Sequence, residues 1–143
     1  MKENAINFLV IEDNELDVEK ISRGFRRLKI ANKVTIAGDG YAALDMLRGN
    51  GIHEKLHGPL VVLLDLNMPR MNGFEFLEIL RADDAIKHLP VFVLSTSDRE
   101  KDIEEAYRLN VCGYIVKPIE LEQLFEAIGT LGMYWQLMER PNA

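Results

Sequence analysis

Four apolar runs of the chain end in residues that can bind cations or phosphate. Three are followed by acidic or hydroxyl side chains and one by a lysine: residues 8–11 precede Glu12 and Asp13, 61–64 precede Asp65, 91–94 precede Ser95, and 114–116 precede Lys117. If these runs are neighbouring parallel strands, their carboxyl ends converge on the crevice where open α/β sheets place ligands. The sequence therefore predicts a polar site centred on Asp65.

The three carboxylates predict a metal site. Glu12, Asp13 and Asp65 would lie within a few ångströms of one another, where each like-charged pair costs about 4 kcal/mol at an effective dielectric constant of about 20. Such a group needs a cation, and oxygen ligands without histidine or cysteine suit a hard ion such as Mg²⁺. For Glu12 and Asp13 alone, acids that only begin a helix are an equally good interpretation.

Asp65 also has the setting of a nucleophile. The residues after it, 66–73, include a proline and a glycine that favour a tight turn around the acid. An aspartate can attack phosphorus and form an acyl phosphate, a transfer that requires mainly positioning and charge neutralisation. Lys117 would then neutralise the phosphoryl oxygens and Ser95 would donate its hydroxyl. Taken alone, Lys117 is better explained as a solvated lysine before a turn than as a phosphate ligand.

Strands and helices alternate along the chain, which predicts an α/β fold. Apolar residues recur at helical spacing after Asn14, a candidate cap. The spacing and turn residues predict a strand at 33–37, helices at 41–48 and 73–81, a loop at 49–59, a helix from a cap at Asp98 to Asn110, and a last helix from Leu121. Parallel strands need crossovers, so five such units imply a mainly parallel sheet covered on both faces.

The bulk properties predict a single domain in the cytoplasm. The 143 residues suit one unit spanning 1–143, with a core over about 6–130 and a C-terminal helical extension and tail over 131–143. The net charge of -6 argues against nucleic acid as a partner. No apolar run is long enough for a membrane span, and no signal peptide is evident. The one cysteine, Cys112, cannot form an internal disulfide and is predicted to be a small core residue.

Together, these residues resemble the receiver domain of bacterial two-component response regulators. The match covers nearly the whole chain and rests on Glu12-Asp13, Asp65 with Met68-Pro69 and Gly73, Ser95, and Gly113-Tyr114 with Lys117-Pro118. The intervals from Asp65 to Ser95 and from Ser95 to Lys117 are also those of the family. The resemblance implies a flavodoxin-like, open five-stranded parallel sheet with strand order 2-1-3-4-5 and helices on both faces.

The resemblance also implies roles for single residues. Asp65 would accept phosphate from a sensor histidine kinase. Asp13, Asp65 and the backbone carbonyl of Asn67 would hold Mg²⁺, and Glu12 would act through water. Ser95 and Tyr114 would form the switch that reports phosphorylation, while Asn67 and Ser97 occupy positions that tune how fast the phosphoryl group is lost. The protein would thus be a phosphoacceptor switch that assists its own phosphorylation and dephosphorylation, and not an enzyme.

The partners follow from the same resemblance. With no effector domain in the chain, an unidentified downstream protein would read the signal. The loop 49–59, residues 110–112 and the tail at 133–135 look like single-domain regulators that serve bacterial phytochromes, which makes a phytochrome a candidate kinase. The fourth helix, fifth strand, last helix and tail form a candidate output or homodimer surface. The apolar residues of 133–138 fit equally a tail that folds back on its own domain.

Three other interpretations compete with a phosphoacceptor. Residues 53–57 match the zinc-protease pattern H-E-x-x-H, but flanking glycines and a proline leave little room for the helix that it needs. A haloacid-dehalogenase-like phosphatase also uses an aspartate nucleophile and Mg²⁺, but it needs a second aspartate where this chain has Asn67. A receiver-like binding module that takes no phosphate would have no need of Asp13, Asp65, Ser95 and Lys117 together.

Overall fold

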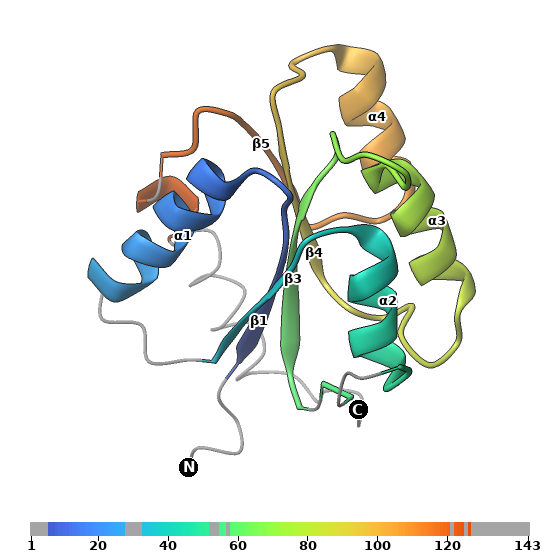
Figure 1. The fold of residues 1–143 in the computed structure, drawn as a ribbon. Coiled ribbons are helices and arrows are strands. Elements are labelled where there is room, and N and C mark those ends of the chain that lie inside the picture. Colours follow the sequence, from blue (N-terminus) through green and yellow to red (C-terminus); the bar gives the residue numbers. More distant parts are fainter. Residues whose placement is uncertain are drawn as a thin grey trace.

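The computed structural model describes residues 6–27, 33–51, 55–56, 58–120, 122–124 and 126. Within these residues, strands and helices alternate along the chain (Figure 1). They are β1 (Asn7–Ile11), α1 (Glu15–Arg27), β2 (Val34–Ala37), α2 (Gly40–Arg48), β3 (Leu60–Asp65), α3 (Gly73–Ala82), β4 (Val91–Ser95), α4 (Glu100–Arg108) and β5 (Gly113–Val116). No helix in this part of the chain is long and apolar enough to cross a membrane.

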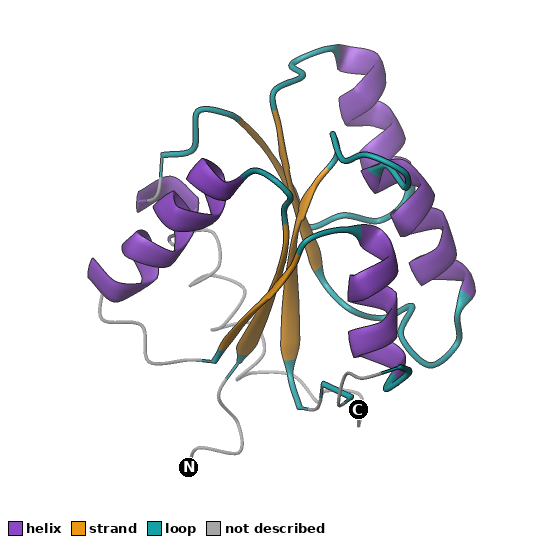
Figure 2. Ribbon diagram, viewed as in Figure 1, coloured by secondary structure: helices purple, strands orange, loops and turns teal. Residues whose placement is uncertain are grey.

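The strands form one parallel sheet in the order β2-β1-β3-β4-β5. This confirms the predicted open sheet with order 2-1-3-4-5, and Figure 2 shows helices on both of its sides. β1 and β3 are neighbours, and Ile11 is paired with Leu64. The residues that follow this pair, Glu12 and Asp65, therefore lie side by side at the carboxyl edge of the sheet, where the strand order reverses.

Two apolar layers, one on each face of the sheet, hold the helices. Side chains alternate along a strand, so Leu9 and Ile11 of β1 lie in one layer and Phe8 and Val10 in the other. The first layer lies under α2, α3 and α4, and the second lies under α1 (Figure 1). Every residue of β3 and of β4 is buried, which explains why both strands are almost continuously apolar.

The start of α1 is capped as predicted. The Asn14 side-chain oxygen accepts a hydrogen bond from the Asp17 backbone N–H at 3.0 Å. Ile21 and Phe25 are buried, and the Phe25 ring packs edge-on against Phe8 with ring centroids 4.9 Å apart. The cap and this packing fix where α1 leaves the end of β1.

The start of α4 differs from the prediction. The N-cap is Arg99, whose side chain makes no capping hydrogen bond, so the predicted cap at Asp98 is wrong. The Ser97 hydroxyl accepts the Arg99 N–H at 3.3 Å and donates to the Asp102 carboxylate at 2.6 Å. The Ser97 side chain, one residue before Asp98, therefore supports the first turn of α4. At the other end, Asn110 has φ 61°, the left-handed conformation expected there.

Cys112 is exposed, so its predicted place in the core is wrong. Its neighbour Val111 is buried instead and fills the core position before β5. The H-E-x-x-H segment lies mostly outside the described residues, as does the tail at 131–143. Of the predicted last helix, Leu124 is described and is fully buried. The domain limits remain a prediction.

Candidate functional site

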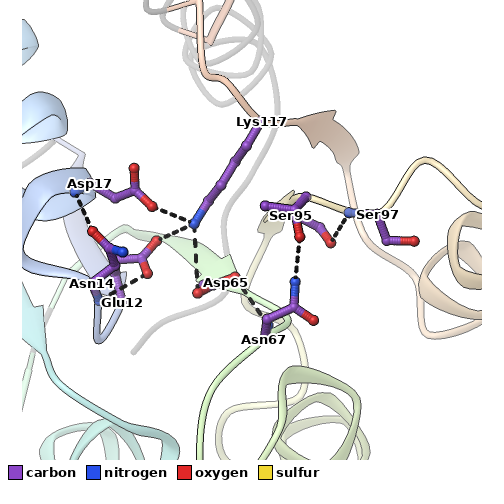
Figure 3. Close-up of polar contacts among 9 residues, drawn as sticks. Glu12, Asn14, Asp17, Asp65, Asn67, Ser95, Ser97 and Lys117 are labelled. Carbon is purple, nitrogen blue, oxygen red and sulfur yellow. Dashed lines mark hydrogen bonds and ion pairs between the residues drawn. The ribbon is translucent and has the colours of Figure 1, made fainter.

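The strand ends bring the predicted side chains together (Figure 3). Glu12, Asp65 and Ser95 are polar residues buried at 1%, 3% and 0% exposure. They are buried because each ends or follows a strand that both layers of helices cover. Buried carboxylates need partners, since an unpaired charge away from water is costly.

Lys117 is the cation of this group. Its Nζ lies 2.7 Å from Asp17 Oδ2, 2.9 Å from Glu12 Oε1 and 3.7 Å from Asp65 Oδ2. The backbone N–H of Lys117 donates to the Ser95 carbonyl at 2.7 Å, which continues the β4–β5 pairing and sets where the lysine leaves the sheet. The prediction that Lys117 reaches the Asp65 region is confirmed, and the alternative of a solvated lysine is wrong, because its side chain is only 10% exposed.

The charges of the site shift the pKa values of its members. Burial alone would lower the pKa of Lys117, but hydrogen bonds to Asp17 and Glu12, with the charge of Asp65, raise it above its ordinary value. Burial raises the pKa of Glu12 to about 7, and contact with Asp65 acts in the same direction, against Lys117. Lys117 therefore does not fully offset the effects of burial and of Asp65 on the pKa of Glu12.

The acidic triad, Glu12, Asp13 and Asp65, fits a metal ion. One carboxylate oxygen from each lies within 4.8 Å of the others, the closeness that the sequence predicts. Asp13 is exposed while the other two are buried, so an ion could reach the triad from solvent. Oxygen donors of this kind suit a hard divalent cation such as Mg²⁺.

The turn after Asp65 holds its carboxylate in place. The Asn67 backbone N–H donates to Asp65 Oδ1 at 3.0 Å, and the Asn67 side chain donates to the Thr96 hydroxyl at 3.0 Å. The Gly73 N–H closes the turn on the Leu66 carbonyl at 2.9 Å. The predicted tight turn is thus confirmed, and it ties the loop after β3 to the loop after β4.

Ser95 and Tyr114 both bond to Ser97. The Ser97 N–H donates to Ser95 Oγ at 3.0 Å, and the Tyr114 hydroxyl donates to the Ser97 carbonyl at 2.9 Å. The two residues that the family resemblance assigns to a switch are therefore linked through one residue. Their role in switching remains a prediction.

Two contacts of the site were not foreseen from the sequence. The sequence predictions assign no part in the site to Asp17 or to Thr96. For Asp17 a signal was present, because a residue three positions after the cap Asn14 lies in the first turn of a helix that starts at the crevice. For Thr96 no spacing pointed to Asn67, since the two are 29 residues apart on different loops.

Comparison with known proteins places the chain in a family. The model of the response regulator receiver domain matches residues 8–129. Response regulator Rcp1 of Synechocystis sp. is 32% identical over 127 residues, which cover 89% of this chain and 86% of Rcp1. The Mn²⁺-bound structure of Rcp1 superposes with a TM-score of 0.75 at 30% identity and covers 96% of this chain and 99% of that one.

Two further solved structures carry phytochrome in their names. The bacteriophytochrome response regulator AtBRR has a TM-score of 0.78 and 38% identity, over 94% of this chain and 97% of that one. The phosphorylated cyanobacterial phytochrome response regulator RcpA has a TM-score of 0.76 and 35% identity, over 91% and 93%. Fold, site geometry and relatives agree, and the chain belongs to the family of response regulator receiver domains.

Proposed function

We propose that the protein is a phosphorylation switch in which Asp65 accepts a phosphoryl group from a sensor histidine kinase. The observation that carries the proposal is the buried Asp65 carboxylate, which lies within the acidic triad and 3.7 Å from the Lys117 ammonium. One Asp65 oxygen is held by the Asn67 N–H and the other faces Lys117. The carboxylate is thus oriented and flanked by a cation, as phosphoryl transfer requires.

In the proposed reaction, Asp65 attacks the phosphorus atom of the phosphohistidine. An oxygen–phosphorus bond forms to Asp65 as the bond to the donor nitrogen breaks, and the histidine leaves with the electron pair. Lys117 and Ser95 would stabilise the negative charge on the transferred oxygens. Asp13, Asp65 and the Asn67 carbonyl would hold Mg²⁺, with Glu12 acting through water, and the bound ion would supply further neutralisation. Mn²⁺ in the related Rcp1 supports a divalent ion here.

The signal would leave the site through Ser97. An acyl phosphate on Asp65 offers new acceptor oxygens beside Ser95, whose hydroxyl now accepts the Ser97 N–H. If Ser95 turns to donate to the phosphoryl group, it changes its bond to Ser97, and Ser97 also holds the Tyr114 hydroxyl. A shift from mostly off to mostly on requires about 5.5 kcal/mol of differential interaction for a change from 1:99 to 99:1.

The output would be read by another molecule at the surface of α4 and β5. Tyr107 of α4 and Val116 of β5 are exposed there, and apolar side chains at a surface often mark an interface. A second copy of the chain and an unidentified downstream protein are both candidates. The names of AtBRR and RcpA support a phytochrome as the kinase. A single receiver unit in the cytoplasm is the setting in which such a kinase would act.

Acetyl phosphate with Mg²⁺ tests the proposal directly. The wild-type protein should gain the mass of one phosphoryl group in intact-mass measurements, and chelation of Mg²⁺ should prevent the gain. Asp65→Asn should show no gain because it lacks the nucleophile, whereas Asp84→Asn should behave as wild type, since Asp84 is an exposed residue remote from the triad. No gain from either acetyl phosphate or a phosphorylated histidine kinase would overturn the proposal.

A further inference from the structure

The Lys117 ammonium is not held mainly by the aspartate that it is expected to serve. Its two hydrogen bonds go to Asp17 at 2.7 Å and to Glu12 at 2.9 Å, whereas Asp65 lies at 3.7 Å, beyond hydrogen-bond distance (Figure 3). A lysine has three donor hydrogens, and two of them are used away from Asp65. In the unphosphorylated site, the Lys117 ammonium therefore lies closer to Asp17 and Glu12 than to Asp65.

Asp17 is well placed to hold the lysine there. Its backbone N–H bonds to the Asn14 cap, so the first turn of α1 fixes the position of its carboxylate. Its side chain is 22% exposed and that of Lys117 is 10% exposed, so the pair is largely shielded from water. Ion pairs in such a setting are screened less than surface pairs.

The acyl phosphate would need the same ammonium. A phosphoryl group on Asp65 attracts Lys117 through charged oxygens, and a hydrogen bond to them draws Nζ toward Asp65 and away from Asp17. A partner that binds the cation only in the resting arrangement stabilises that arrangement. By linkage, the same contact must weaken the hold of the site on the phosphoryl group.

We propose that Asp17 is a positioning residue that retains Lys117 in the resting state and competes with the phosphoryl group on Asp65 for it. The proposal rests on the phosphorylation of Asp65 proposed above. Asp17 would act through Lys117 and would contact neither the metal ion nor the phosphoryl group. It would set how readily the protein enters its phosphorylated state.

Beryllofluoride, which binds an aspartate carboxylate as a mimic of the phosphoryl group, tests the competition with Mg²⁺ present. Asp17→Asn should bind beryllofluoride about five- to tenfold more tightly than wild type in calorimetry, a modest coupling between linked groups. The matched control is Glu15→Gln, which removes one negative charge from the same first turn of α1 without touching Lys117. It should change the affinity for beryllofluoride less than about twofold, because a surface charge is screened by salt.

A double-mutant cycle separates competition for Lys117 from a general loss of negative charge. In a Lys117→Met background, Asp17→Asn should have no more effect than Glu15→Gln, because the cation for which Asp17 competes is gone. A second readout needs neither metal nor beryllofluoride: the side-chain NMR signal of Lys117 in metal-free protein should move in Asp17→Asn and stay in place in Glu15→Gln. This readout remains if the Lys117→Met variants do not fold.

The outcomes distinguish the two proposals. If wild type takes neither beryllofluoride nor phosphate, the proposed function is wrong and this inference is wrong with it. If wild type takes both but Asp17→Asn binds beryllofluoride like Glu15→Gln, or more weakly than wild type, the positioning role alone is overturned. The same holds if Asp17→Asn keeps its full effect without Lys117.

Discussion

Ser97 joins three segments of the site through single hydrogen bonds. Its N–H donates to Ser95, its carbonyl accepts from Tyr114, and its hydroxyl donates to Asp102. It thereby connects the end of β4, the strand β5 and the first turn of α4 within one residue. In the proposed switch, a change at the Ser95 hydroxyl would therefore reach both Tyr114 and α4 through the hydrogen bonds of this one residue.

The hydrogen bond between Ser97 and Asp102 predicts how two substitutions change the pKa of Asp102. The pKa of Asp102 lies below its ordinary value, chiefly because the Ser97 hydroxyl donates to it and less because of Arg99. Ser97→Ala should therefore raise the pKa of Asp102, and Arg99→Gln should raise it less. Titration of the Asp102 carboxyl by NMR measures both. An unchanged pKa in Ser97→Ala would contradict the hydrogen bond.

The sign of the pH effect on stability follows from the lowered pKa. A carboxyl group with a lowered pKa in the folded state stabilises the fold above its unfolded value, near 3.8 for aspartate. That stabilisation is lost as the pH falls through the folded value. Ser97→Ala should thus lose less stability than wild type on acidification below about pH 4, a difference that urea unfolding at several pH values detects.

The convergence of the predicted site residues was accessible from sequence, whereas the Asp17 contact was not. Residues at the ends of neighbouring parallel strands must meet at one edge, whatever their rotamers, so Asp65, Ser95 and Lys117 could be placed together from their positions alone. The Asp17–Lys117 bond joins residues 100 positions apart and depends on how α1 is rotated over the sheet. No periodicity of the sequence reports that rotation closely enough to identify a single contact.

The helix α3 approaches the turn after Asp65 so closely that the first residue of the helix, Gly73, has no room for a side chain. A Cβ on Gly73 would lie 2.6 Å from the Cα of Leu66, a backbone atom that cannot easily move. A capping box between Asn72 and Glu75 fixes the same end of the helix. The position of α3 and the shape of the Asp65 loop are therefore set together.

Gly73→Ala should lower the free energy of unfolding by about 1–3 kcal/mol, the usual cost of forcing an extra group into a packed site. It should also slow phosphorylation by acetyl phosphate, because the Asp65 loop must shift. Gly38→Ala is the control, since a Cβ there meets nothing within 4 Å. Urea unfolding measures the stability, and equal loss in the two variants would contradict the close approach.

Arg81 at the end of α3 ties three segments together. Its guanidinium donates to the carbonyls of Lys87, Leu89, Leu109 and Asn110 at 2.7 to 2.9 Å. These carbonyls belong to the chain before β4 and the turn after α4. Burial lowers the pKa of Arg81, as expected for a cation withdrawn from water. The planar fork of an arginine suits four acceptors in a way that a lysine does not.

Arg81→Ala should cost about 2–4 kcal/mol in urea unfolding, because four carbonyls lose this donor and those of Leu89 and Leu109 are part-buried. Arg81→Lys should recover little of this loss. The control is Arg48→Ala, which breaks a partly exposed ion pair with Asp83 and should cost about 1 kcal/mol or less. If Arg81→Lys were as stable as wild type, the four carbonyl bonds would not be the reason for the effect.

Element boundaries followed from sequence where a single residue type decides them. The left-handed Asn110 and the cap Asn14 lie where the sequence predicts, since few other residue types suit those conformations. The start of α4 was missed because the Ser97–Asp102 bridge, not the nearest acidic side chain, supports its first turn. Competing caps within three residues cannot be ranked without the geometry of the loop.

The described helices of the molecule differ in how many apolar side chains they bury. α3 buries Phe76, Leu77 and Leu80 in its apolar layer, whereas Ala106 is the only buried residue of α4. A helix with one small buried side chain loses little when it shifts, and segments with few buried apolar contacts open most easily. Among the described helices α1 to α4, the one that adjoins Ser97 is thus the one whose displacement costs least.

This difference should be visible in hydrogen exchange. The amides of α4 should exchange faster than those of α3 in the unphosphorylated protein, because local opening of α4 exposes little apolar surface. Beryllofluoride with Mg²⁺ should then change exchange in α4 more than in α3, since Ser97 links the first turn of α4 to Ser95. Asp65→Asn is the control: its α4 should still exchange faster than its α3, but beryllofluoride should change exchange in neither helix. Equal protection of the two helices, or a response confined to α3, would place the mobile element elsewhere in the molecule.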